Sequence, residues 1–232
     1  MAPLQPTTLQ AIARIFNSLD YHALGAIYCH EGGDAFWEER RDPCQKLGIQ
    51  LAEVLRDRLR PNGRSLYVGA GVAELPILAM ETMELHRTVE AYNLRAEEVP
   101  LLNQACAGMP FQFQAKDARG ASGTFEHLWI VSVLNDPECF PELGALSSGR
   151  ANPVTFDPAS FMIEREAVLA LAAGCLEKVA RTGLVTTSVE EIPWITDWCE
   201  RQGLACVVED EDYPTAIVAD PICFIRIGEP SR

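Results

Sequence analysis

Two glycines separated by one residue, Gly69 and Gly71, stand where the apolar run from Ser65 to Val68 gives way to a helical pattern. This arrangement predicts a strand, a tight turn and the start of a helix. Glycine lets the backbone turn sharply and approach a ligand closely, and the N–H groups at the start of the helix are free hydrogen-bond donors. In doubly wound sheets, such a turn at the carboxyl end of a parallel strand binds nucleotide-like cofactors.

Two acidic residues follow at positions from which they would reach the same ligand. Glu90 lies 19 residues after Gly71, close to the ~20 residues at which a carboxylate reaches a ribose hydroxyl in a βαβ nucleotide site. Asp117 follows residues 111–116, which alternate in polarity as a strand does. We expect Asp117 beside the same crevice.

The elements that must position these residues alternate between strands and helices. Apolar runs predict strands at 65–68, 88–92, 111–116, 125–134, 184–189, 205–208 and 222–227. Helical spacing predicts helices at about 9–19, 43–59, 74–84, 96–107, 157–181 and 193–202. Gly183 is expected to close the fifth of these helices. Strands that alternate with helices after a helical extension predict a mostly parallel sheet, and two strands in succession at the end predict an antiparallel edge.

The first 60 residues are expected to form a separate N-terminal helical extension or lid, and residues 61–232 the main domain. Residues 28–41 mix glycine, aromatic and charged residues without a strong period, which favours a loop or lid. A helix is expected to begin immediately afterwards, with Asp42 as the N-cap and Pro43 at the first helical position.

Composition limits the class of protein. With 48% hydrophobic and 22% charged residues, the sequence is that of an ordinary globular protein, and no apolar run approaches the ~18 residues that a membrane span needs. The net charge of −14 disfavours nucleic acid as a partner. Eight dispersed cysteines without a CxxC pair, and an N-terminus without a signal-peptide pattern, predict free thiols and a cytoplasmic protein. No metal is expected, since His30 with scattered carboxylates makes a weak ligand set.

The pattern resembles the class I S-adenosylmethionine-dependent methyltransferases over about residues 43–228. Residues 65–75 are similar to the glycine-rich first motif of that family, and Gly69 and Gly71 match its first two glycines. The resemblance implies a Rossmann-like, seven-stranded, mostly parallel sheet with an antiparallel last strand, helices on both faces, and S-adenosylmethionine as cofactor. It implies that Gly69, Ala70 and Gly71 contact the cofactor, that Glu90 holds the ribose hydroxyls, and that Asp117 with Ala118 meets the adenine.

Two departures from the family pattern leave alternatives open. Tyr67 stands where the family usually has an acidic residue, and Ala73 stands where it usually has a third glycine. The same fold could therefore bind the cofactor without methyl transfer, or transfer an aminopropyl group. A nicotinamide-dependent oxidoreductase is a further alternative, but the sixth position of its GxGxxG pattern is here Glu74, which would obstruct a pyrophosphate.

Candidates for contact with the substrate are fewer. The loop after the fourth strand carries Asn135 and Asp136, which the resemblance places next to the transferred methyl group; a turn or helix-capping role is the alternative for Asn-Asp-Pro. The acidic run 209–212, with Glu31 and Asp34, suggests attraction of a cationic small molecule such as an amine. Arg40 and Arg41 could instead hold a carboxylate.

Overall fold

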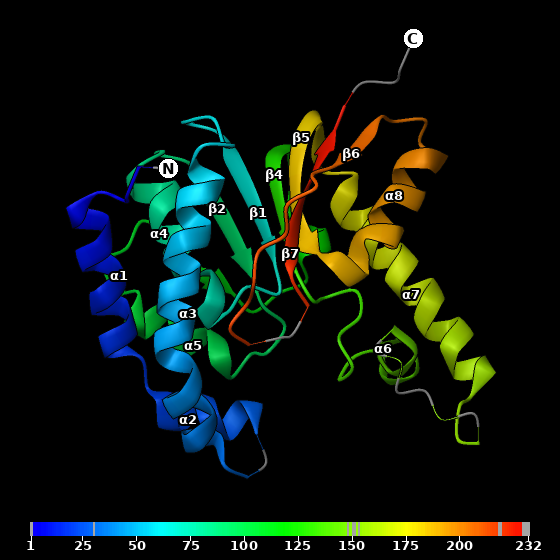
Figure 1. Cartoon of the computed structure of the whole chain (residues 1–232), viewed down its shortest axis with the longest axis horizontal. Helices are drawn as coiled ribbons and strands as arrows, with labels where there is room; N and C mark the ends of the chain where they lie inside the picture. Colours follow the sequence, from blue (N-terminus) through cyan, green and yellow to red (C-terminus); the bar gives the residue numbers. More distant parts are fainter. Residues whose placement is uncertain are drawn as a thin grey trace. The chain divides into compact units, whose positions relative to one another are not determined.

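The computed structural model describes residues 2–29, 31–147, 149, 152, 154–217 and 220–228. They form a seven-stranded sheet in the order β3-β2-β1-β4-β5-β7-β6 (Figure 1). The chain divides into two compact units, one of residues 1–121 with 213–219 and one of residues 122–212 with 220–232. The predicted boundary between residues 60 and 61 stays a prediction about domain organisation.

The first unit contains the N-terminal helices and three parallel strands. Its elements are α1 (Pro6–Ser18), α2 (Tyr21–Tyr28), α3 (Gly33–Arg56), β1 (Arg64–Val68), the 3₁₀ turn η1 (Val72–Glu74), α4 (Leu75–Met83), β2 (Thr88–Tyr92), α5 (Glu98–Ala105), β3 (Phe113–Gln114) and the 3₁₀ turn η2 (Ala118–Gly120). Strand β2 pairs in parallel with both β1 and β3. Strand β1 is buried from Ser65 to Val68, as a central strand should be, and α4 is buried along almost its whole length.

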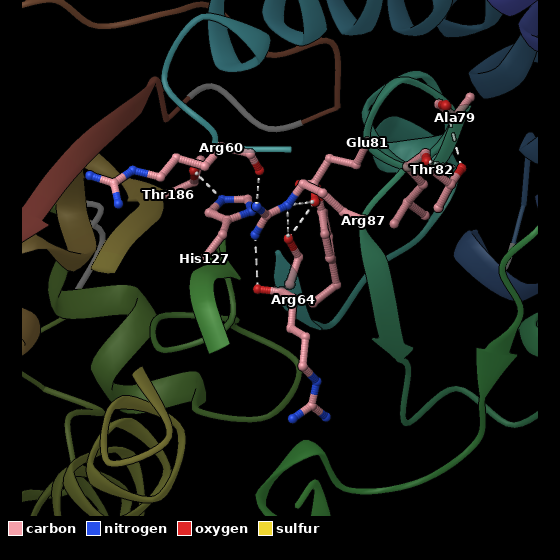
Figure 2. Close-up of polar contacts among 11 residues, drawn as sticks. Arg60, Arg64, Ala79, Glu81, Thr82, Arg87, His127 and Thr186 are labelled. Atoms are coloured by element: carbon pink, nitrogen blue, oxygen red, sulfur yellow. Dashed lines mark hydrogen bonds and ion pairs between the residues drawn. The ribbon is translucent and has the colours of Figure 1, made fainter. Parts of the chain in front are cut away.

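The second unit contains four strands, of which one runs against the others. Its elements are β4 (Phe125–Ile130), α6 (Pro141–Ser147), α7 (Pro158–Leu176), β5 (Val179–Ser188), the 3₁₀ turn η3 (Val189–Glu191), α8 (Ile192–Arg201), β6 (Cys206–Val208) and β7 (Ile222–Ile227). Strands β4 and β5 are parallel, and β7 is antiparallel to both β5 and β6. Buried His127 shares a hydrogen bond of 2.9 Å with Thr186, which gives it a structural role in the core (Figure 2).

The predicted fold class is confirmed, and the antiparallel strand is the last one along the chain. Its position differs from the expectation, because β7 lies between β5 and β6 and leaves β6 at the edge. The last strand along the chain, β7, is inserted between two earlier strands and is not added at the edge. The order of strands along the chain therefore did not predict their order in the sheet.

The predicted loop at 28–41 and the helix start at Asp42 are wrong. Helix α3 begins at Gly33, whose predecessor Gly32 has a φ of 76°, and it runs through Pro43 to Arg56. A proline inside a helix removes one hydrogen bond and normally ends the helix. Trp37 is 1% exposed and packs against the rings of Tyr21, Tyr28 and Phe36. This burial stabilises the turns of α3 that precede Pro43.

The predicted end of α7 is also wrong. The helix ends at Leu176, and Gly183 lies inside β5 and not at a helix C-terminus. The N-terminus of α7 is confirmed, because Asp157 accepts a hydrogen bond of 3.0 Å from the Ala159 N–H and Pro158 follows it. Helices α2 and α6 were not expected.

In the described part of the chain, no helix is long and apolar enough to cross a membrane.

Candidate active site

The glycine turn follows β1 and has the backbone geometry that glycine permits. Gly69 has a φ of 71°, in the left-handed region that residues with a Cβ rarely adopt. The next residue, Ala70, is fully buried, and its N–H donates to the Tyr92 carbonyl at 3.0 Å. The turn is therefore fixed against the end of β2.

Glu74 closes the start of the following helix. Its Oε2 accepts a hydrogen bond of 2.7 Å from the Gly71 N–H. A helix N-terminus that binds phosphate uses free N–H groups, whereas this N–H already has a carboxylate partner. Glu74 therefore occupies the Gly71 N–H, and its conflict with a pyrophosphate stays a prediction.

A second carboxylate, Glu98 of α5, lies at the same turn. It is fully buried, and it accepts hydrogen bonds from the Tyr28 hydroxyl at 2.8 Å and from Asn93 Nδ2 at 3.0 Å. A Cβ built on Gly71 would lie 3.1 Å from Glu98 Oε1 and 3.2 Å from the Tyr28 hydroxyl. We call Tyr28, Glu74, Asn93 and Glu98 the turn cluster.

Burial sets the ionisation of the turn cluster. It raises the pKa of Glu98, although the hydrogen bonds from Tyr28 and Asn93 act in the opposite direction. Burial and the neighbouring Glu98 raise the pKa of the Tyr28 hydroxyl, so Tyr28 remains a neutral donor. The guanidinium of Arg95, 4.9 Å from the centre of the Tyr28 ring, also acts against the effect of burial on Glu98. The cluster therefore places two carboxyl groups, Glu74 and Glu98, beside Gly71.

The structure places Glu90 away from the end of its strand. In the register of β1 and β2, Glu90 is level with Leu66. Because a strand rises about 3.3 Å per residue, Glu90 lies about 10 Å before Asn93 along the backbone. Its carboxylate pairs with Arg64 at 2.7 Å and accepts from the Tyr92 hydroxyl at 2.9 Å. The ribose role of Glu90 stays a prediction, and Asn93 is the residue that follows the strand.

Asn93 was missed by counting from the glycines, although its position directly after an apolar strand is a usable signal. It is buried, its Nδ2 donates to the Ala70 carbonyl at 2.9 Å, and its Oδ1 accepts from the Arg95 N–H at 2.7 Å. Nothing in the sequence pattern indicated that Tyr28 and Glu98 would join it, because they come from α2 and α5.

Asp117 and Ala118 begin η2, shortly after β3. The Asp117 carboxylate pairs with the Arg119 guanidinium at 2.6 Å, and the hydrogen bond from Arg119 lowers the pKa of Asp117. Both side chains of this pair are at least 40% exposed, so water and ligands can reach it. Ala118 is buried. Contact of these two residues with an adenine stays a prediction.

Tyr67 belongs to a buried polar network. It is fully buried, and its hydroxyl donates to Glu81 at 2.6 Å. Glu81 also pairs with Arg87 at 3.0 Å and accepts from Ser65, and Arg87 donates to the Arg64 carbonyl at 2.9 Å (Figure 2). Tyr67 therefore serves the packing of β1 against α4.

In the second unit, Asn135 and Asp136 lie in the loop after β4 and already have hydrogen-bond partners. Asn135 Nδ2 donates to Glu190 at 2.9 Å, and the Asp136 carboxylate accepts from the Glu138 N–H at 3.0 Å. Nearby, fully buried Glu191 accepts the N–H groups of Ser132, Val133 and Leu134 at 2.5–3.0 Å. Glu191 thus fixes the loop that carries the two predicted substrate contacts, and their contact with substrate stays a prediction.

The other charged residues considered for substrate binding are mostly paired. Asp34 pairs with His22 at 2.9 Å, Glu209 pairs with Arg226 at 2.9 Å, and the Arg40 guanidinium lies 4.3 Å from the centre of the Phe36 ring. Among the described residues, no group of three histidine, cysteine or acidic side chains could hold a metal ion. His30 lies outside the described residues.

Comparison with known proteins identifies the fold. No model of a protein family matches the sequence, and no curated protein matches it. Magnesium protoporphyrin IX methyltransferase from Synechocystis PCC 6803 with bound S-adenosylmethionine is similar with a TM-score of 0.52 and 13% identity, over 97% of this chain and 99% of that one. The same enzyme with bound S-adenosylhomocysteine is similar with a TM-score of 0.52 and 13% identity, over 94% of this chain and 99% of that one.

A third solved structure, the tRNA m1G37 methyltransferase of M. jannaschii, gives a TM-score of 0.46 and 11% identity, over 80% of this chain and 50% of that one. The chain has the fold of the class I S-adenosylmethionine-dependent methyltransferases.

Proposed function

We propose that this chain binds S-adenosylmethionine at the glycine turn and transfers its methyl group to a small molecule. The observation that carries the proposal is the pair of carboxyl groups, Glu74 and Glu98, that the turn cluster places beside Gly71. S-adenosylmethionine has a cationic sulfonium and a cationic amino group, whereas a nicotinamide dinucleotide carries an anionic pyrophosphate. Two carboxylates attract the first and repel the second.

The backbone and hydrogen bonds at the turn also support the proposal. The left-handed φ of Gly69 explains why a glycine is needed there, and the missing side chain of Gly71 leaves room for Glu98 and Tyr28 beside the turn. From the described residues, Glu98 accepts two hydrogen bonds, while a carboxylate can accept about four. We propose that Glu98 accepts the remaining ones from the cofactor's amino group. Gly69, Ala70 and Gly71 contact the cofactor, with Asp117 and Ala118 at the adenine.

We assign the ribose contact to Asn93 in preference to Glu90. Asn93 directly follows β2, and Glu90 is paired with Arg64 within the strand. The two N–H groups of Asn93 are used by Ala70 and Glu98, but its Oδ1, which accepts from the Arg95 N–H, can accept a second hydrogen bond from a ribose hydroxyl.

When bound, the cofactor supplies a methyl group activated by a positively charged sulfur. The protein's own part is to hold the two reactants in line and to keep water away from them. Asn135 and Asp136 remain the candidates for holding the substrate, on a loop that Glu191 fixes through its backbone N–H groups. The net charge of −14 favours a small, neutral or cationic substrate over nucleic acid.

Calorimetric titration with S-adenosylmethionine and S-adenosylhomocysteine tests the proposal. We expect micromolar binding, about tenfold weaker for Glu98→Gln, because one charge-assisted hydrogen bond is lost. Gly71→Val should abolish binding, because its side chain would meet Glu98 and Tyr28. Glu166→Gln makes the same charge change on the exposed surface of α7 and should bind as the wild type does.

Absence of saturable binding of either ligand to the folded wild-type protein would refute the proposal. Binding without turnover on amine, hydroxyl and carboxyl acceptors would favour the alternative that the chain binds the cofactor without transferring a methyl group. If products instead carry an aminopropyl group, the reaction is the related transfer.

A further inference from the structure

A cavity of about 100 Å³ lies within the second unit at the end of α7, beside α8 and the first residues of β5. Its floor is apolar and buried, with Leu176 1%, Leu204 8% and Ile227 3% exposed. Four polar residues also line it: Glu177, Arg181, Trp198 and Gln202. The combination of an apolar floor with a few convergent polar groups is typical of a small-molecule site.

The polar groups of this cavity lack protein partners. Over the described ranges of the chain, the buried Nε1–H of Trp198 has no hydrogen-bond acceptor. Buried donors in proteins are almost always paired. The side chains of Glu177 and Arg181, which carry opposite charges, take part in no ion pair or hydrogen bond with any described residue. Besides the Gln202 amide, the cavity therefore offers one acceptor group, Glu177, and two donor groups, Arg181 and Trp198, to a ligand.

The two charges define opposite ends for that ligand. Glu177 is the C-cap residue of α7, whose last turn contains no basic residue. A helix C-terminus carries partial negative charge, so Glu177 adds a like charge there and the position favours a cation. Arg181 and the indole N–H of Trp198 favour a carboxylate, which an arginine binds through two parallel hydrogen bonds.

We propose that this cavity binds a small zwitterionic amino acid, with its carboxylate on Arg181 and Trp198 and its ammonium group on Glu177. The volume fits a ligand of this size, because an apolar cavity of ~150 Å³ holds the six carbons of benzene, and glycine has five non-hydrogen atoms. The site lies wholly within the second unit and is independent of the turn cluster in the first.

The test follows the indole N–H signal of Trp198 in two-dimensional ¹H–¹⁵N spectra of the full chain. The protein has four tryptophans, and the spectrum of Trp198→Phe identifies the signal by its absence. We expect glycine to shift this signal saturably, with a millimolar or tighter dissociation constant, because a new hydrogen bond to a carboxylate moves the proton downfield. Acetate and methylammonium, which each carry one of the two charges, should bind at least tenfold more weakly.

Variants separate the two ends of the ligand. Arg181→Gln should weaken glycine binding about tenfold, and Glu177→Gln should remove the preference for glycine over acetate. Arg201→Gln is the matched control, because Arg201 pairs with Asp197 and does not line the cavity. No saturable shift with glycine, or a shift that Arg181→Gln leaves unchanged, would overturn the proposal. Equal binding of acetate and glycine to the wild-type protein would also overturn it.

Discussion

Three buried carboxylates of this chain are stabilised in three different ways. Glu81 has the guanidinium of Arg87, and Glu191 has the backbone N–H groups of Ser132, Val133 and Leu134. Glu98 has only the Tyr28 hydroxyl and the Asn93 amide, and it forms no ion pair with the residues that the structure describes. A buried carboxylate with unused acceptor capacity is costly unless a ligand supplies a donor. This difference favours Glu98 as the residue kept for a cation.

Binding of S-adenosylmethionine should therefore depend on the ionisation of Glu98. Burial raises the pKa of this carboxyl group above its ordinary value of 4.5, and only the ionised form attracts a cation. Affinity should be full above the raised pKa and fall as the pH is lowered through it. Calorimetric titrations of S-adenosylmethionine at stepped pH measure this dependence.

The dependence is distinguishable from acid unfolding. A raised pKa means that the folded state binds this proton more tightly than the unfolded state, so protonation of Glu98 does not itself favour unfolding. Glu98→Gln should show weaker but pH-independent affinity over the same range. A wild-type pH profile identical to that of Glu98→Gln would contradict the assignment.

The buried pair of Arg87 and Glu81 should contribute far more to stability than an exposed pair. Both side chains are fully buried, and Tyr67 and Ser65 complete the hydrogen bonds of Glu81. Arg87→Met leaves a buried carboxylate without its counter-ion. We expect the free energy of unfolding, measured by urea denaturation, to fall by about 3–5 kcal/mol. The double variant Arg87→Met, Glu81→Gln should recover part of that loss, because no charge is left buried.

Arg119→Met provides the exposed comparison. It removes the pair with Asp117, whose side chain is 40% exposed, and should cost less than about 1 kcal/mol. Equal costs for Arg87→Met and Arg119→Met would mean that the buried network does not hold β1 against α4.

At the scale of elements, α3 shows how tertiary packing overrides a local signal. Asp42 and Pro43 form a typical helix start, yet the helix begins ten residues earlier, at Gly33. Helices α2 and α3 approach so closely at Gly25 and Gly33 that a Cβ on either would meet the backbone of the other. Together with the burial of Trp37, this contact stabilises the first turns of α3 in spite of the proline.

Replacing Pro43 should therefore stabilise the protein. Pro43→Ala restores a backbone donor inside α3 and relieves the clash of the proline ring with the preceding turn. It also raises the entropy of the unfolded chain, which destabilises the protein. We expect the first two effects to outweigh the third, so that the free energy of unfolding rises by about 1–2 kcal/mol. The midpoint of urea unfolding should rise accordingly. Pro158→Ala is the matched control, because Pro158 lies in the first turn of α7, where proline is favourable, and its loss should be neutral or slightly destabilising. If both variants behave alike, α3 does not continue through residue 43 in solution.

The sequence predicted elements well where local chemistry and burial agree. Strands β2 and β7 have the predicted bounds, and Asp157 with Pro158 begins α7 as expected. Prediction failed where a residue type is common in two kinds of structure. Glycine is typical of a helix end, but it is also typical of an irregularity in strand pairing, and Gly183 lies where the pairing of β4 with β5 is irregular. The glycine turn was predictable from spacing within one segment. The turn cluster was not, since α2, the end of β2 and α5 meet only after folding.

At the scale of the whole molecule, net charge should decide which class of substrate can approach. Phosphate contacts supply most non-specific affinity for nucleic acid, and a chain with a net charge of −14 repels that backbone. We expect no saturable binding of bulk tRNA below ~100 µM at physiological salt, the weak end of the non-specific range. Fluorescence anisotropy of labelled tRNA measures this binding, with a basic protein as the positive control. Lower salt should weaken any residual interaction, because repulsion between like charges is then less screened. Binding that strengthens as salt is lowered would identify a local basic surface and would contradict the proposed small-molecule substrate.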